Sequence, residues 1–217
     1  CHRPPWRLAL ALTAALTLAA PAGARTLTVC ADPNNLPFSN ERREGFENAI
    51  AEVLGDELGL PVEYTWFAQR RGFVRNTLRA GECDVVPGIV ASSELVLTTR
   101  PYYRSTYVFV TRADARPAVA RLASLDDPAL RRLRIGVHVV GDDYTNTPPA
   151  HALANRGIIE NVHGYTLYGD YAQPDPPLAL VRAVADGEID VAIAWGPFAG
   201  WMARRGAPIA LRPVSPE

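Results

Sequence analysis

The residue types that usually carry out catalysis do not form a recognisable constellation in this sequence. His138, His151 and His163 are scattered, without a His-x-x-x-His or Cys-x-x-Cys spacing that would hold a metal ion. There is no Gly-x-Ser-x-Gly nucleophile motif and no glycine pattern for phosphate or dinucleotide binding. The chain contains no lysine, which excludes Schiff-base and P-loop lysine chemistry. We therefore expect no catalytic residues, no metal site and no cofactor.

Polar and aromatic side chains gather instead where strands are expected to end, the edge at which open parallel sheets bind ligands. We expect these side chains to line a cleft for a ligand or partner, although each aromatic residue could equally pack in a core. In the first half of the chain they are Asp32, Asn34, Asn35, Phe38, Gln69, Arg70, Arg71, Gly88, Tyr102, Tyr103 and Arg104. In the second half they are Asp142, Asp143, Tyr144 and Trp195.

An internal repeat indicates how these residues are positioned. The strand-like residues 27–31 correspond to 133–137, and Gly-Glu-x-Asp-Val recurs at 81–85 and 187–191, both at an offset of 106 residues. The two matches at one offset predict two α/β lobes with a cleft between them. The alternative is chance, because this motif also describes any helix that ends before a strand.

Periodicity predicts the elements of each lobe. After the first strand, lobe one has helices at 46–58 and 71–80 and strands at 62–66, 83–86 and 105–111. Lobe two has strands at 133–137, 165–168, 189–195 and 208–211, with helices at 150–155, 177–185 and 198–205. The β-α-β order predicts parallel sheets with right-handed crossovers.

The N-terminal residues have the pattern of a signal peptide. Arg3 and Arg7 precede an uncharged apolar run over 8–20, and Ala22-Gly23-Ala24 fits a cleavage site. The run is shorter than the ~20 apolar residues of a comfortable membrane span. We expect a signal peptide over 1–24 and no stable membrane insertion after its cleavage, with an uncleaved anchor as the alternative. The formal net charge of −1 without a basic tract argues against nucleic-acid binding.

Two cysteines, Cys30 and Cys83, remain after the signal peptide. Both fall on predicted strands of lobe one, and an oxidising compartment would allow a single disulfide between them. Two buried thiols are the alternative.

Several strings of the chain resemble bacterial periplasmic solute-binding proteins of the amino-acid-receptor type, namely residues 27–38, 45–59, 81–88 and 98–103. Residues 29–40, 69–78 and 98–105 are similar to the MxaJ/XoxJ-type binding proteins associated with PQQ-dependent methanol dehydrogenases. The resemblance implies an α/β, two-lobed type 2 fold, each lobe a mainly parallel sheet flanked by helices. Lobe one would span 25–112, and lobe two 113–217 with the start of a return segment whose remainder is expected to be missing.

Three departures from the amino-acid receptors bear on the ligand. Those receptors carry an Arg that binds the ligand carboxylate where residues 91–95 have none, and a Gly-Thr-Thr-like helix start where Asp142 and Asp143 stand. They also carry an ammonium-binding Asp where Trp195 is followed by Gly196. Losing a bidentate Arg–carboxylate pair removes the most directional contact of such a site. The resemblance thus implies a retained scaffold without α-amino-acid binding.

The role implied is that of a periplasmic, non-enzymatic accessory protein of a PQQ-dependent methanol or alcohol dehydrogenase, acting in maturation or by direct binding. A transporter receptor for a small non-amino-acid solute is the alternative. A hydrolytic enzyme on this scaffold is disfavoured because no catalytic constellation is present.

Overall fold

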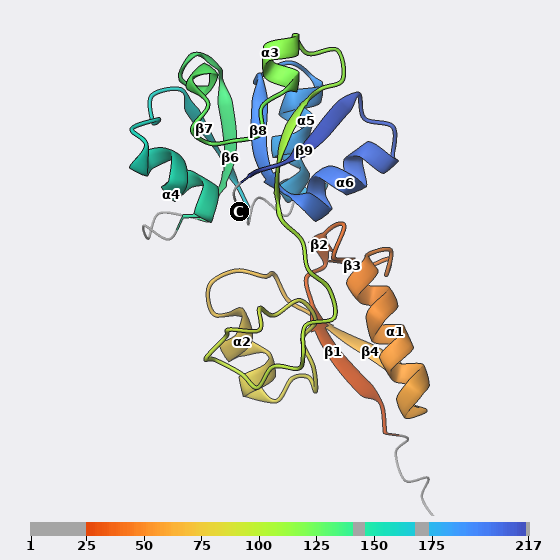
Figure 1. The fold of residues 1–217 in the computed structure, drawn as a ribbon. Helices are drawn as coiled ribbons and strands as arrows, with labels where there is room; N and C mark the ends of the chain where they lie inside the picture. Colours follow the sequence, from red (N-terminus) through yellow and green to blue (C-terminus); the bar gives the residue numbers. More distant parts are fainter. Residues whose placement is uncertain (1–24, 141–145, 168–173, 216–217) are drawn as a thin grey trace, which may run out of the picture.

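The structure is a computed structural model that describes residues 25–140, 146–167 and 174–215. The predicted signal peptide lies outside the described residues, as do Asp142, Asp143 and Tyr144. Figure 1 shows two α/β lobes, and the chain passes from the first to the second through the segment that precedes residue 107.

Lobe one is built on two parallel strands. β1 (Leu27–Ala31) pairs with β4 (Val62–Trp66), so that Leu27 lies opposite Val62. A short antiparallel pair, β2 (Asn34–Asn35) and β3 (Ser39–Asn40), follows β1. Helix α1 (Phe46–Leu58) covers the sheet by packing Ala51 against Leu27 and Val29.

Helix α1 begins and ends as the sequence predicts. The Asn48 side-chain oxygen accepts a hydrogen bond from the backbone N–H of Gly45 (3.1 Å), the residue that caps the start of the helix, and a second from the N–H of Asn40 in β3 (3.2 Å). A Cβ at Gly45 would collide with the Phe38 carbonyl, so only glycine fits there. At the other end, Gly59 adopts the left-handed conformation (φ 65°) of a helix cap.

The helix predicted at 71–80 forms in two pieces, α2 (Phe73–Asn76) and the 3₁₀ turn η1 (Leu78–Ala80). Gly72 has a φ of 84°, so the helix cannot begin before Phe73. Thr77 leaves the helical conformation, and its hydroxyl donates a hydrogen bond to the Phe73 carbonyl (2.6 Å). Arg70 and Arg71 therefore lie in the turn before the helix.

Lobe two contains a five-stranded sheet in the order β7-β6-β8-β5-β9. β6 is parallel to β7 and β8, whereas β5 is antiparallel to β8 and β9. The strand predicted at 105–111 therefore forms as β5 but pairs within lobe two, although the expected boundary at 112 places it in lobe one. The strands are β5 (Tyr107–Arg112), β6 (Ile135–Val139), β7 (Val162–Thr166), β8 (Val191–Trp195) and β9 (Ile209–Pro213).

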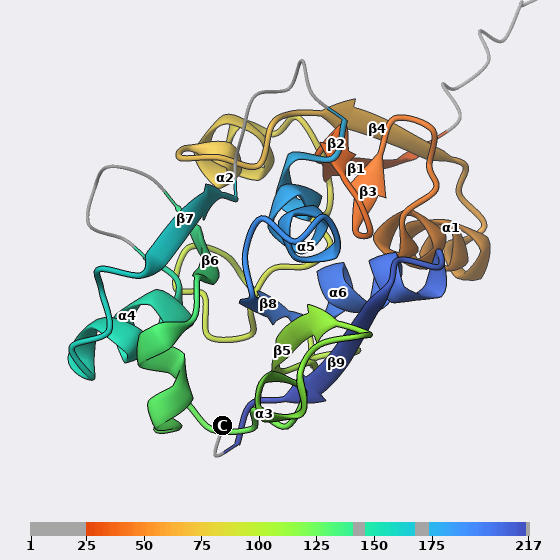
Figure 2. The same ribbon diagram turned by 90° about the horizontal axis from the view of Figure 1, so that it is seen from above.

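Helices cover both faces of this sheet (Figure 2). Val108 and Val110 of β5 pack with α5 and α6, while Phe109 packs on the opposite face with Leu153 of α4, as alternation along a strand requires. No helix among the described residues is long and apolar enough to cross a membrane. The helical segments are α3 (Pro117–Ala120), η2 (Pro128–Arg132), α4 (Pro148–Asn155), η3 (Pro176–Leu178), α5 (Ala179–Ala185) and α6 (Gly196–Arg204).

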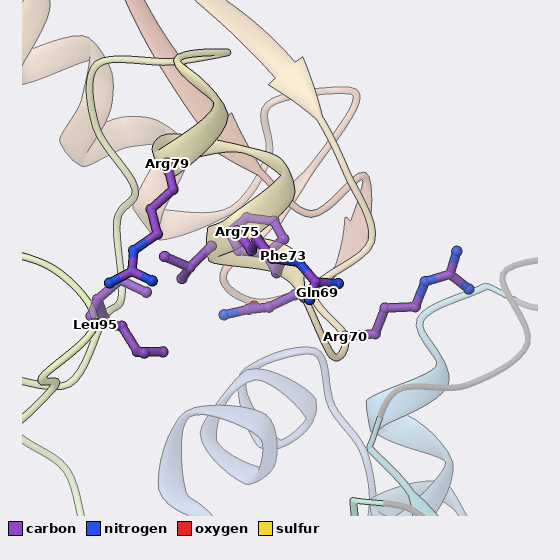
Figure 3. A pocket seen from close by; sticks show the side chains of 9 residues that line it. Gln69, Arg70, Phe73, Arg75, Arg79 and Leu95 are labelled. Atoms are coloured by element: carbon purple, nitrogen blue, oxygen red, sulfur yellow. The ribbon is translucent and has the colours of Figure 1, made fainter.

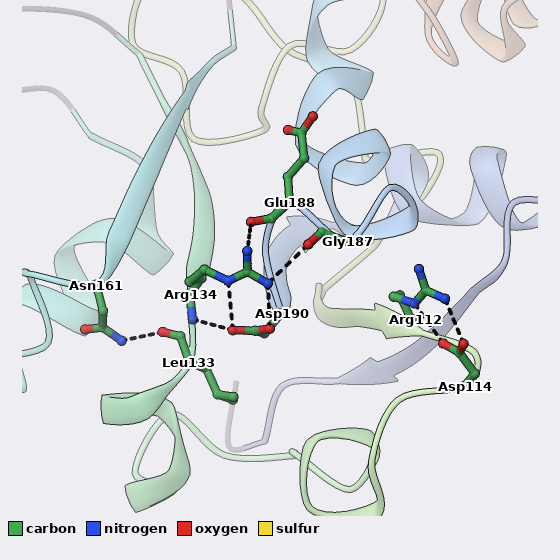
Figure 4. A network of polar contacts seen from close by, with 8 residues as sticks. All are labelled: Arg112, Asp114, Leu133, Arg134, Asn161, Gly187, Glu188 and Asp190. Atoms are coloured by element: carbon green, nitrogen blue, oxygen red, sulfur yellow. Dashed lines mark hydrogen bonds and ion pairs between the residues drawn. The ribbon is translucent and has the colours of Figure 1, made fainter.

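The sequence repeat corresponds to a repeated set of hydrogen bonds. In lobe one the Asp84 carboxylate accepts from the Thr28 backbone N–H (2.9 Å). In lobe two Asp190 accepts from the N–H of Arg134 (2.8 Å), whose guanidinium also bonds the Glu188 and Gly187 carbonyls (Figure 4). Each Asp therefore ties its segment to the start of the corresponding strand, β1 in lobe one and β6 in lobe two, which confirms the two-lobe plan.

The segment predicted as a strand at 83–86 makes a single isolated bridge, between Val85 and Val29. It is held to β1 by the Cys30–Cys83 disulfide, with a Cα–Cα distance of 5.6 Å. The disulfide prediction is confirmed. The predicted strand is wrong, because this segment has no further strand partner among the described residues.

Candidate binding site between the lobes

Asp32 organises the loop that follows β1. Its carboxylate accepts hydrogen bonds from the backbone N–H groups of Asn34 (2.8 Å) and Gln69 (2.6 Å). The Asn35 side-chain amide also donates to the Gln69 side-chain oxygen (3.1 Å). Because β1 and β4 are parallel, their carboxyl ends meet, and four of the predicted site residues are brought together there.

This loop contacts lobe two directly. The Asn34 side-chain oxygen accepts a hydrogen bond from the Asp175 backbone N–H (3.0 Å). The Phe38 ring lies 5.2 Å from the ring of Phe198, which is buried in lobe two and in turn contacts His138. Figure 1 shows β2 beneath the end of lobe two that carries α6. The loop after β1 is therefore part of the interface between the lobes.

Tyr102 and Tyr103 form a second group of predicted residues. The Tyr102 hydroxyl accepts a hydrogen bond from the Gly88 N–H (2.9 Å). The Trp195 side chain at the end of β8 lies near enough to the Tyr103 hydroxyl to act on its pKa, so this pair also connects the lobes. Burial raises the pKa of Tyr103 to about 12, and the nearby charge of Glu47 adds to the effect.

Glu47, in the first turn of α1, belongs to this second group and was not predicted from the sequence. Its side chain is 8 % exposed, and burial raises its pKa to about 7. A Cβ at Gly88 would overlap its carboxylate, so the two residues are in direct contact. The apolar periodicity of α1 marks only the residues that face the sheet. The sequence near Glu47 shows only a glycine, Gly45, followed by an acidic residue in the first helical turn. This pattern marks the start of a helix but does not indicate that the acidic side chain is buried.

The arginines at the rim have a different environment. Arg70, Arg71 and Arg104 are exposed. Arg70 belongs to a lobe-one pocket of about 270 Å³ whose polar lining comes mainly from Gln69 and three arginines (Figure 3). The Arg70 guanidinium points away from Arg79, so these cations do not converge on one point. The labelled lining residues are Gln69, Arg70, Phe73, Arg75, Arg79 and Leu95.

A second pocket, of about 310 Å³, lies in lobe two beside Trp195. Its walls are mostly apolar, with the hydroxyls of Ser105 and Thr106 at one side. Trp195 packs its ring 5.1 Å from that of Tyr107 in this region. The remaining lining residues are Leu125, Pro148, Pro149, Ala152, Ile193 and Val214.

The histidine that ends a strand is part of the core. His138 is 4 % exposed, and its Nε2–H donates to the Pro177 carbonyl (2.8 Å). Burial lowers its pKa to about 4. Within the described parts of the chain, no group of three His, Cys, Asp or Glu side chains could hold a metal ion.

Comparison with known proteins identifies the family. Protein MoxJ of Paracoccus denitrificans is 35 % identical over 192 residues, which span 86 % of this chain and 68 % of MoxJ. The crystal structure of the periplasmic binding protein XoxJ from Methylobacterium extorquens AM1 aligns with a TM-score of 0.70 and 37 % identity, covering 88 % of this chain and 79 % of that chain.

The crystal structure of MxaJ from Methylophaga aminisulfidivorans MPT aligns with a TM-score of 0.68 and 26 % identity, covering 88 % of this chain and 78 % of that chain. No protein-family model matches the sequence. The identity and coverage shared with MoxJ and XoxJ, together with the two-lobed fold, show that the chain belongs to the MxaJ/XoxJ-type periplasmic binding proteins.

Proposed function

We propose that this chain is a periplasmic, non-enzymatic accessory protein of a PQQ-dependent, methanol-type dehydrogenase system. It would bind the dehydrogenase or assist its maturation. The observation that carries the proposal is the 35 % identity with MoxJ over 68 % of that protein's length. The signal-peptide pattern over 1–24 supports the compartment.

The environment of Trp195 supports the loss of α-amino-acid binding. At the end of β8, Trp195 packs against Tyr107 and lies beside Tyr103. An indole N–H is a neutral donor without an acceptor site, so it cannot neutralise a ligand ammonium group as a carboxylate would. We propose that the retained cleft, with the loop after β1 and the two tyrosines at its rim, contacts a partner segment or a different solute.

The exposed arginines support a protein partner with an acidic surface. Arg70, Arg75 and Arg79 have no ion pair or hydrogen bond with any described residue. Their guanidinium groups are spread around an apolar pocket floor that includes Phe73. Spread cations match an extended acidic surface better than one small anion, and they steer association electrostatically.

The test is co-purification of the tagged chain with the dehydrogenase from the host periplasm. An Arg75→Glu/Arg79→Glu variant should lose roughly tenfold or more in affinity at low salt, because two favourable charge contacts become repulsive. Arg132→Glu, an exposed charge reversal in lobe two, is the matched control. Recovery of a transporter permease in place of the dehydrogenase would contradict the proposal.

The alternative, a receptor for a small solute, is favoured by the apolar pocket beside Trp195. A ligand at 100 times its dissociation constant should raise the free energy of unfolding by about 2.7 kcal/mol. A thermal-shift screen of uncharged periplasmic solutes separates the two functions, since only the receptor requires a strong hit.

A further inference from the structure

Glu47 is a buried carboxylate for which the proposed function gives no role. Its side chain is 8 % exposed and makes no hydrogen bond or ion pair with any described residue. By contrast, Asp32, which is 3 % exposed, accepts two backbone hydrogen bonds. Burying a carboxylate without a partner costs several kcal/mol, so such groups are normally paired. No described cation or donor is paired with the Glu47 carboxylate, and its oxygens keep contact with solvent, whereas the Asn48 Nδ2 atom beside it in the sequence is fully enclosed.

Among the described residues, the surroundings of Glu47 carry hydroxyl groups but no cation. Tyr102 and Tyr103 face it, and the charge of Glu47 helps to raise the pKa of both phenols. The Tyr102 hydroxyl already accepts a hydrogen bond from the Gly88 N–H, and the Tyr103 hydroxyl lies near the Trp195 side chain. No described Arg or His acts on Glu47, because burial alone accounts for its raised pKa.

Aromatic rings complete the surroundings. The Phe46 ring lies 5.3 Å from Tyr103 and 5.2 Å from Phe38, and Tyr103 lies 5.4 Å from Tyr102. Aromatic faces attract organic cations, most strongly where water is excluded. Phe38 and Tyr103 are also the residues that contact Phe198 and Trp195 of lobe two. A group bound beside Glu47 would therefore lie where the lobes meet.

We propose that Glu47 is the counter-ion for the ammonium group of a small alkylammonium ligand, held against Tyr102, Tyr103 and Phe46 between the lobes. The ligand carries no carboxylate beside its ammonium group, because Glu47 would repel that carboxylate and no described cation lies beside it. The inference rests on the proposed function only in placing the binding site between the lobes.

The experiment is calorimetric titration of the purified full chain at pH 8 with ethylammonium chloride, at ionic strength held constant with sodium chloride. We expect saturable binding, and binding of glycine weaker by about tenfold or more. Glu47→Gln should weaken ethylammonium binding roughly tenfold to a hundredfold, since it removes a charged hydrogen-bond acceptor. Glu44→Gln is the matched control, because that carboxylate near the same helix start is exposed and paired with Arg42.

The pH dependence gives a second readout. Binding to the wild-type chain should weaken as the pH falls through 7, as a proton replaces the ammonium group on Glu47, and Glu47→Gln should not show this dependence. Absence of saturable binding, or equal affinity in Glu47→Gln, would overturn the inference. Either result leaves co-purification with the dehydrogenase intact, so the two proposals fail separately.

Discussion

At Gly88 the backbone has a φ of 77° and touches the Glu47 carboxylate, whereas Gly81 has a φ of 76° and open space within 4 Å of where a Cβ would stand. Substitution of Gly81 therefore tests the cost of a positive φ alone, whereas substitution of Gly88 adds the cost of a steric clash. Gly81→Ala should cost ~1–2 kcal/mol of unfolding free energy, and Gly88→Ala a further ~1–3 kcal/mol. Urea denaturation measures both. In a Glu47→Ala background the difference between the two glycine substitutions should disappear; its persistence would show that Glu47 is not the obstacle.

Glu47 also predicts a pH dependence of stability. Its pKa is raised from 4.5 to about 7 in the folded chain, so the folded state holds the proton more tightly than the unfolded state. The stability it contributes is present below pH 4.5 and is lost as the pH rises through 7. Relative to Glu47→Gln, the wild-type chain should lose ~3 kcal/mol between pH 4.5 and 8. Parallel stability curves for the two proteins would contradict this.

Which site residues could be predicted depends on what fixes their positions. Asp32, Asn35 and Gln69 follow strands that must end at one edge of a parallel sheet, so the sequence order brings them together. The Glu47 carboxylate lies against Gly88, which is far from it in the sequence, and helical periodicity carries no information on that contact. Asp142, Asp143 and Tyr144 lie outside the described residues, and their roles stay predictions.

At the scale of elements, the repeat was predictable because equivalent residues, Asp84 and Asp190, fasten the starts of β1 and β6 in the two lobes. The absence of a strand at 83–86 was not predictable, because a strand forms only beside a neighbouring strand, whereas the local sequence indicates only the propensity to form one. The same limit explains β5, whose apolar residues predict a strand but not the sheet that it joins.

The disulfide should strengthen the attachment of residues 83–86 to β1, which also rests on the Val85–Val29 bridge and on hydrogen bonds of Asp84 and Val85 with Thr28 and Cys30. Cys30 and Cys83 are 53 residues apart, and opening a loop of this size should cost ~2–4 kcal/mol. A Cys30→Ala/Cys83→Ala variant should show this loss in urea denaturation. Adding a reductant should lower the stability of the wild-type chain toward that of the variant and leave the variant unchanged. An equal effect of reductant on both would assign the loss to another cause.

At the scale of the whole molecule, the lobes meet through a few contacts of the loop after β1 and the tyrosine pair. The Phe38–Phe198 contact should contribute ~0.5–1.5 kcal/mol to the arrangement in which they touch. Phe38→Ala should therefore increase the population of separated lobes by about 2–10-fold. Spin labels at Val53 and Ile159, exposed on lobe one and lobe two, would report this as a longer distance distribution in a Cys1→Ser background.

Phe67→Ala is the matched control for this measurement, because Phe67 contacts Phe73 entirely within lobe one. It should lower the unfolding free energy of lobe one while leaving the distance between the labels unchanged. If both substitutions lengthen the distance equally, loss of lobe-one packing and not the contact between the lobes controls their separation. If only Phe38→Ala does so, the loop after β1 sets how the two lobes are held, and ligand or partner binding at that loop would act on the same equilibrium.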